Sequence, residues 1–191
     1  MKNILLLLPL FAASITLCLA EEAKPNLDDP DTLKKILAEA IDDYDLEYGE
    51  DENKGLICAP VSLRPLTGWA KMVNREGQLR NLEYYKDGKK DGLQTSWYEN
   101  GQKYSEINHK DGTKHGLQTY WHENGQKQKE ITLKDGGKHS TEIRWKKNGQ
   151  KQVEITRKNG KKHGLETWWD EEGNIIQQKR YENGQQVEKI K

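Results

Sequence analysis

The chain has few of the residues that build an ordinary hydrophobic core. Hydrophobic residues make up 33% of its 191 positions, and the one phenylalanine, Phe11, lies in the N-terminal apolar run. A packed globular interior needs more Leu, Ile, Val and Phe than this. So polar a composition is compatible with disorder, but tryptophan and glycine recur at regular intervals. We therefore expect an ordered fold with little interior per residue.

Cysteine is nearly absent as well. Cys18 lies within residues 1–20, which carry a basic residue at Lys2, continue as an apolar run to Leu19 and end on Ala20 before two glutamates. This order is typical of a secretory signal peptide that is cleaved after its last small residue. Because Cys58 would then be the one remaining thiol, we expect an exported protein, periplasmic or secreted, without an internal disulfide.

The chain has no net charge, but the balance hides an asymmetry. Residues 21–57 hold thirteen acidic and four basic side chains, whereas residues 58–191 hold eighteen acidic and twenty-six basic ones. An acidic segment beside a mildly basic body favours attraction between the two. Within the body the two signs alternate, which is typical of a solvated surface and not of the basic stripe that tracks nucleic acid.

Arrangements of residues that support catalysis are missing. Cys58 has no histidine at a fixed spacing, and the Asp-Gly-Gly run at 135–137 is a turn signal and not a phosphate-binding loop. The paired carboxylates at 42–43 and 171–172 fall at a helix end and in a turn, where solvated charge is ordinary. We therefore expect no enzyme and no cofactor.

Three histidines recur every 24 residues: His115, His139 and His163. Equivalent positions two strands apart would lie about 9.6 Å from each other. A zinc ion bonded at ~2.0–2.1 Å to each ligand is not shared across that gap. The histidine row therefore predicts no metal site.

Residues 21–54 are predicted to form an acidic linker with one amphipathic helix. The apolar residues follow the spacing of one helix face: Leu33, Ile36, Leu37, Ala40 and Ile41. Asp29 can cap this helix, with Pro30 at the first helical position. Because acidic residues at the C-terminal end oppose the helix macrodipole, the helix should fray near Tyr44.

From Gly68 onward the sequence repeats every 24 residues. Two glycine series run unbroken. The first is Gly77, Gly101, Gly125, Gly149 and Gly173, and the second is Gly88, Gly112, Gly136, Gly160 and Gly184. A third series holds Gly68, Gly92, Gly116 and Gly164, interrupted at Ser140, and a fourth holds Trp97, Trp121, Trp145 and Trp169. Four series in one register indicate tandem structural repeats.

Each repeat contains two turn signals, Glu99-Asn100-Gly101-Gln102 and Lys110-Asp111-Gly112-Thr113. Asn-Gly and Asp-Gly both accept the positive φ angles of a type I′ turn, and strands of about five to seven residues lie between them. Connections this short join only antiparallel neighbours. The sequence thus predicts an all-β fold, an elongated antiparallel meander of tandem hairpins with roughly ten strands.

Alternation along each strand suggests two unlike faces. Leu93, Thr95 and Trp97 share one parity, and on the return strand Ile107 and Glu106 have opposite parities. We assign Ile107, Ile131 and Ile155 to the face of the tryptophans, and Glu106, Glu130 and Glu154 to a polar face. This assignment predicts a one-sided sheet.

The units Trp97-Tyr98-Glu99-Asn100-Gly101-Gln102-Lys103 and Lys110-Asp111-Gly112-Thr113-Lys114-His115-Gly116 resemble MORN repeats, specifically the bacterial variant form. The resemblance covers residues 68–187. Together with the patterns above, it divides the chain into a predicted signal peptide (1–20), an acidic segment with a helix (21–54), a lead-in (55–67) and five repeats (68–191). It implies an elongated sheet with one hairpin per repeat, used for interaction and not for catalysis. Some members of the family are associated with membrane surfaces, and some bacterial ones are labelled antitoxins.

The tryptophan series is the candidate binding site: Trp97, Trp121, Trp145 and Trp169. Aromatic side chains also stabilise sheets by cross-strand packing, and both roles are compatible. The expected function is an exported scaffolding or interaction module with a protein partner, with self-association as a further possibility. The alternatives are an antitoxin-like inhibitor, which export disfavours, and membrane-surface binding, which requires basic residues segregated to one face.

Cleavage of the signal peptide can be measured directly. Protein from the envelope fraction should have the intact mass of a chain that begins at Glu21, because the leader is removed after Ala20. A mass that retains Met1 would indicate a membrane anchor, although no basic stop-transfer flank follows the apolar run. A lipid adduct on Cys18 would indicate a lipoprotein. Either result would contradict the export prediction.

Overall fold

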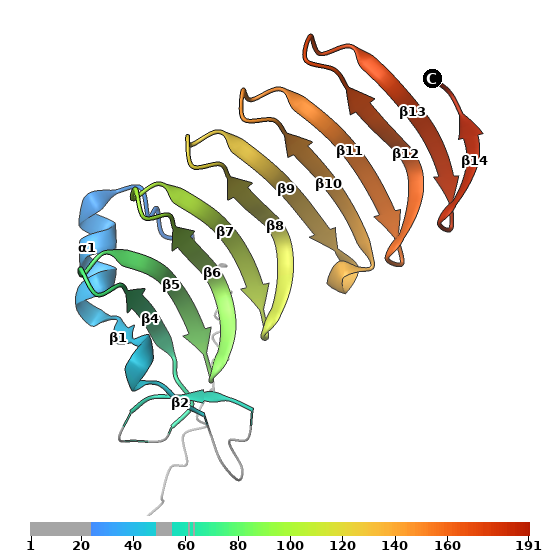
Figure 1. Ribbon diagram of the computed structural model, residues 1–191. Helices are drawn as coiled ribbons and strands as arrows, with labels where there is room; N and C mark the ends of the chain where they lie inside the picture. Colours follow the sequence, from blue (N-terminus) through green and yellow to red (C-terminus); the bar gives the residue numbers. More distant parts are fainter. Residues whose placement is uncertain (1–23, 49–54, 61, 63) are drawn as a thin grey trace, which may run out of the picture.

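The computed structural model describes residues 24–48, 55–60, 62 and 64–191, and the predicted signal peptide lies outside these residues. The described chain forms one long sheet of consecutive antiparallel hairpins, with a short helix beside its N-terminal strands (Figure 1). The prediction of an all-β meander with a short N-terminal helix is confirmed.

The first elements belong to the acidic segment and the lead-in. They are the helix α1 (Pro30–Glu39), the strand β1 (Ile41–Asp42), the 3-10 turn η1 (Asp43–Asp45) and the strands β2 (Glu47–Tyr48) and β3 (Ile57–Cys58). Asp29 caps α1 through the backbone N–H of Thr32 (2.8 Å), and Pro30 opens it, both as predicted. The helix ends at Glu39, before Tyr44, because Ala40 is extended and Ile41 joins the main sheet as a parallel partner of Ala70.

The repeats supply the other strands of the main sheet. These are β4 (Gly68–Val73), β5 (Leu79–Lys86), β6 (Lys89–Trp97), β7 (Lys103–Lys110), β8 (Thr113–Trp121), β9 (Lys127–Lys134), β10 (His139–Trp145), β11 (Lys151–Lys158), β12 (Lys161–Trp169), β13 (Ile175–Glu182) and β14 (Gln185–Lys189), with the 3-10 turn η3 (Asp135–Gly137) after β9. Each strand pairs with the next, and all bow in the same direction in Figure 1. Most are longer than predicted, because pairing continues up to the residues that flank each turn, as in Lys110 opposite Thr113.

The two turns of a repeat differ in conformation. Asp111 (φ 49°) and Gly112 (φ 80°) both have positive φ, so the type I′ prediction is confirmed at the Asp-Gly turn. At the other turn Gly101 alone has positive φ (80°), and its N–H donates to the Tyr98 carbonyl at 3.1 Å. That turn is a three-residue loop closed by glycine, so the type I′ prediction is wrong there. Asn100 accepts the N–H of Gln102 at 3.0 Å instead of adopting positive φ.

The fourth repeat redistributes two residues. In the third repeat β8 carries a bulge between the pairs His109–Lys114 and Ile107–Gln118, next to Gly116 with its φ of 63°. Ser140 replaces this glycine in β10, and β10 pairs regularly with β9. The two extra residues lie in the turn, which widens into η3 (Figure 1). The pairing beyond the turn keeps the same register, so the sheet continues undisturbed.

The sheet is not one-sided, and the predicted placement of the isoleucine and glutamate series is wrong. Glu106 lies directly opposite Thr95 and Thr119, whereas Ile107 lies opposite Gln94 and Gln118. Residues directly opposite each other in an antiparallel pair project to the same side. The glutamates therefore share a face with the tryptophans, and the isoleucines share the other face with Gln94 and its equivalents. Alternation within one strand does not fix how its faces relate to those of its neighbour.

We call the side that bears Leu93, Thr95, Trp97 and their equivalents the Trp face, and the other side the opposite face. Both contain buried side chains, because neighbours on adjacent strands cover one another. On the Trp face Thr119 and Thr167 are 6% and 7% exposed. On the opposite face Val153 and Gln118 are 1% and 3% exposed. The interior is therefore divided between two thin layers.

The predicted acidic linker is instead docked on the sheet. Residues 24–40, which we call the arm, lie across the Trp face at the first strands (Figure 1). Leu27 and Ala40 of the arm are buried with Leu82 and Leu93 of the sheet. The residues packed around this cluster are Leu33, Ile36, Leu37, Trp69 and Trp97.

The lead-in covers the opposite face at the same end of the sheet. Leu66 packs with Ala70 and Tyr85, and the segment between β1 and β4 adds further apolar side chains. The backbone of Ile57 lies against the first Asp-Gly turn, with its N–H 2.9 Å from the Gly88 carbonyl. A Cβ on Gly88 would lie 2.6 Å from that of Leu56, so this glycine permits the close approach. The N-terminal region thus caps the repeat array on both faces.

Deletions should reveal the modular construction. Removing 117–140 joins Gly116 to Thr141 in register and should leave a folded β-rich protein, because each hairpin contacts only its neighbours. Removing 117–128 deletes most of β8 and the turn after it, so the sequence of β9 follows that of β7. These two strands run in the same direction in the native sheet, so this deletion should abolish folding. Circular dichroism and size-exclusion chromatography would report the result. Equal behaviour of the two deletions would contradict the 24-residue unit.

Candidate functional site

The Trp face carries a repeated set of three side chains: a tryptophan, a lysine from the preceding repeat and a glutamate. The Nζ atoms of Lys103, Lys127 and Lys151 lie 6.0, 5.8 and 5.5 Å from the ring centres of Trp121, Trp145 and Trp169. The same lysines pair with Glu106, Glu130 and Glu154 at 2.5, 2.5 and 3.2 Å. Lysine above an indole is a favourable cation–π contact. We call one such set of tryptophan, lysine and glutamate a rung. Each rung therefore presents an aromatic surface beside a lysine whose charge is balanced by a glutamate.

The arm covers only the N-terminal part of this face. Leu93, beneath the arm, is 9% exposed, whereas its equivalents Leu117 and Leu165 are 45% and 40% exposed. The lysines show the same step, because the side chain of Lys103 is 19% exposed and those of Lys127 and Lys151 are 50% and 45% exposed. From β8 onward, no segment of the described residues takes over the arm's role on the Trp face.

The four predicted binding residues therefore fall into two groups. Trp97 packs in the cluster under the arm. Trp121, Trp145 and Trp169 are half-buried and lie on the part of the Trp face that the arm leaves free. Their binding role stays a prediction. The sequence treats all four alike, since they occupy one position of the repeat.

Sequence reasoning missed the lysines and misplaced the glutamates of this site. Lys103, Lys127 and Lys151 recur at the repeat period, which is the signal that could have found them. The turn centred on Asn100-Gly101 places Glu106 directly opposite Thr95, which is on the same side of its strand as Trp97. Because directly opposite residues project to the same side, this register would have placed the glutamates on the Trp face.

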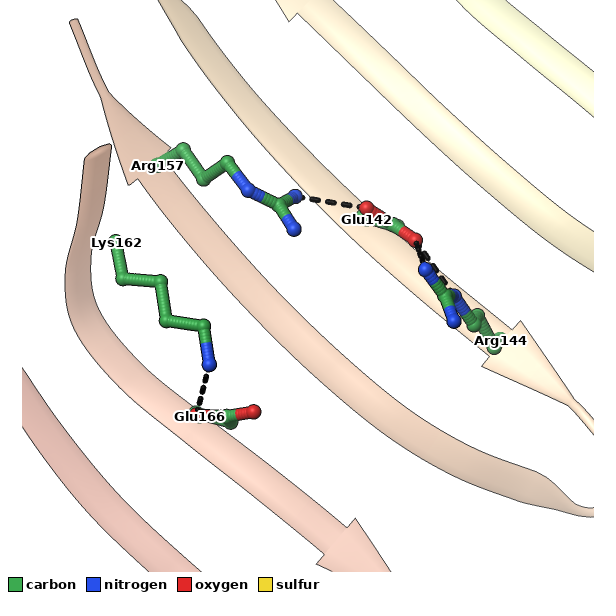
Figure 2. A network of polar contacts seen from close by, with 5 residues as sticks. All are labelled: Glu142, Arg144, Arg157, Lys162 and Glu166. Carbon is green, nitrogen blue, oxygen red and sulfur yellow. Dashed lines mark hydrogen bonds and ion pairs between the residues drawn. The ribbon is translucent and has the colours of Figure 1, made fainter. Parts of the chain in front are cut away.

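The carboxylates of the sheet strands whose pKa is lowered lie on the opposite face, and each one is paired. Glu142 accepts from Arg144 Nε at 2.6 Å and from Arg157 Nη1 at 2.7 Å, while Glu166 accepts from Lys162 Nζ at 2.8 Å (Figure 2). Trp168 Nε1 also donates to Glu166, at 3.2 Å. The contact between Arg157 and Glu142 joins β11 to β10, whereas Arg144, Lys162 and Trp168 each pair with a glutamate of their own strand.

The pKa shifts on this face follow from these contacts. Burial raises the pKa of Glu142, but its hydrogen bonds to two arginines outweigh burial, so the pKa is lowered from its ordinary value. The pKa of Glu166 is lowered in the same way, with Lys162 as the main opposing cation. A general acid needs a carboxyl whose pKa is raised, so both groups serve as fixed anions that hold strands together.

The histidine row does not converge. His139 Nδ1 lies 3.0 Å from Asp135 Oδ2 within one turn. In the part of the chain that the structure describes, no three histidine, cysteine or carboxylate side chains come together as metal ligands would. None of the helices described there has the length and apolarity to cross a bilayer.

A single-layer sheet of tandem hairpins, capped at one end and with an open aromatic face, defines a β-hairpin repeat protein. The family model described as "MORN repeat variant" matches residues 90–111, 114–135 and 162–185. The chain is a MORN-repeat protein. Such repeats are generally found in proteins that bind other proteins or membranes, and the family is typically non-catalytic. No curated protein matches the sequence.

The ion pairs of Glu142 can be tested by substitution and pH. Glu142→Gln should lower the free energy of unfolding by about 1–2 kcal/mol at pH 7, because two arginines lose their partner but remain partly solvated. A lowered folded-state pKa contributes stability above the ordinary carboxyl pKa of 4.5, and this contribution is lost as the pH falls through the folded-state pKa. The difference between the two proteins should therefore shrink in acid. Urea titrations at several pH values would measure it.

The matched control is Glu171→Gln, in an exposed turn, which should leave the free energy of unfolding unchanged. A constant difference between wild type and Glu142→Gln from pH 7 down to acid denaturation would contradict the assigned ion pairs.

Proposed function

We propose that the mature chain is an exported, non-catalytic interaction module whose contact surface is the uncovered Trp face. The observation that carries the proposal is the step in exposure between Leu93 under the arm and Leu117 and Leu165 beyond it. The same repeated surface is covered at one end by the chain itself and left open along the rest. Contiguous exposed apolar area of this kind usually marks a contact surface.

The composition of the open surface supports a protein partner. Trp121, Trp145 and Trp169 are the residue type most enriched at the centres of protein interfaces. The spacing of two strands per repeat, about 9.6 Å, sets them along a line that an elongated partner can follow. Export is supported by the composition of residues 1–20, and it favours a scaffold in the envelope or outside the cell over an antitoxin for a cytoplasmic target.

A protein partner is favoured over a membrane surface by the charges on the Trp face. Lys127 and Lys151 each pair with a glutamate of the same face, Glu130 and Glu154. An anionic membrane attracts segregated basic clusters, whereas Lys127 and Lys151 each have an adjacent anion. The surface therefore suits a partner with its own mixed charges.

Trp145→Ala should weaken partner binding beyond any effect on folding. Because the ring is half-buried, we expect a loss of about 2 kcal/mol in stability. Binding should be compared at a temperature where circular dichroism shows the variant fully folded. The measurement is affinity purification from envelope extract together with the size-exclusion elution volume.

Trp168→Ala is the matched control, because Trp168 is also half-buried but lies on the opposite face. It should lose comparable stability and keep its partners. Unchanged capture and elution for folded Trp145→Ala would refute a binding role for the Trp face.

A further inference from the structure

The arm shows by example what the Trp face can hold. Its apolar helix side packs on Trp69, Leu93 and Trp97, and Leu27 is 5% exposed just before the helix. At the N-terminal end of the arm, Asp28 Oδ1 lies 2.7 Å from Lys103 Nζ. At the other end the Leu37 carbonyl accepts from Lys71 Nζ at 3.1 Å. The occupant is thus an amphipathic helix whose leading residues are acidic.

The contact between Asp28 and Lys103 involves a rung that the sheet repeats. Hydrogen bonds to Asp28 and Glu106 outweigh the burial that opposes charge on Lys103, and the pKa of Lys103 is raised. Lys127 and Lys151 stand one and two repeats further on, each with its own glutamate and tryptophan. Within the described residues, neither has an ion pair with a segment outside the repeats. Two copies of the arm's anchoring site are therefore open.

The apolar floor of the open sites resembles that under the arm, but it is narrower. Leu117 and Leu165 repeat the position of Leu93, and three tryptophans repeat the position of Trp97. Leu82 has no apolar equivalent, since Glu106, Glu130 and Glu154 take its place. An occupant must therefore keep its acidic residues at the lysine end and present no carboxylate to the glutamate row.

We propose that the Trp face over β8–β13 docks an amphipathic helix of a partner protein that begins with acidic residues, with its carboxylates on Lys127 and Lys151. The inference rests on the proposed function and names the class of partner. A second copy of this chain is the weaker occupant, because its arm is already docked on its own Trp69, Leu82 and Leu93.

The test uses the full mature chain and a labelled synthetic peptide with the sequence of residues 24–45 as the probe. Fluorescence anisotropy should show saturable binding that weakens as salt is raised. The double variant Lys127→Gln/Lys151→Gln should weaken binding about five-fold or more. A peptide that carries Asp28→Asn, Asp29→Asn and Asp31→Asn should bind more weakly by a similar factor. The control Lys147→Gln/Lys189→Gln removes the same charge from a turn and from the opposite face, and it should bind as the wild type does.

Three outcomes would overturn the inference. Loss of binding in Lys103→Gln but not in the double variant would mean that the peptide only exchanges with the arm. Sedimentation with phosphatidylglycerol vesicles that depends on Lys127 and Lys151, without peptide binding, would point to a membrane. Absence of peptide binding, while folded Trp145→Ala still loses its envelope partners, would remove the acidic helix and leave the interaction function standing.

Discussion

The rest of the structure depends on the pairing of consecutive hairpins in one 24-residue register. Each repeat adds two strands, so the equivalent of each side chain in the next repeat lies two strands further along the sheet. Tyr98 Oη donates to the Trp121 carbonyl at 2.8 Å, and Asn100 Nδ2 donates to the Glu123 carbonyl at 3.0 Å. A single hairpin would have no layer to bury its side chains against. The array is stable because adjacent repeats supply the packing and hydrogen bonds that a second layer supplies in other folds.

This constraint gives the two faces different roles. Along the opposite face, glutamines, isoleucines and paired carboxylates such as Glu142 form a buried row that joins strands through hydrogen bonds and fixed ion pairs. Along the Trp face, aromatic rings and lysines stay half-exposed, and this is the face for which we propose a binding role. The N-terminal region closes both faces at one end only. The free length of the Trp face is set by where the arm stops.

The fourth repeat shows how much variation the register tolerates. Ser140 does not adopt the positive φ that Gly116 has in the bulge, and the two surplus residues lie in the widened turn at η3. Trp145 still follows Trp121 on the same face. The line of tryptophans thus continues past a local change in the backbone, because the change is confined to one turn and the strand beside it.

The sequence by itself determined the period, the strands, the type I′ turns at Asp-Gly and the capped start of the helix, because each is set by local φ preferences and spacing. Its alternation pattern left the relation between adjacent faces open, and Glu106 and Ile107 were assigned to the wrong sides for that reason. Only the tertiary structure decided that the acidic segment is an arm on the sheet and that Trp97 differs from Trp121, Trp145 and Trp169. These four residues occupy one repeat position, so no local signal separates them. The difference arises from packing between the arm and strands far along the chain, where apolar contact and the Asp28–Lys103 pair act together.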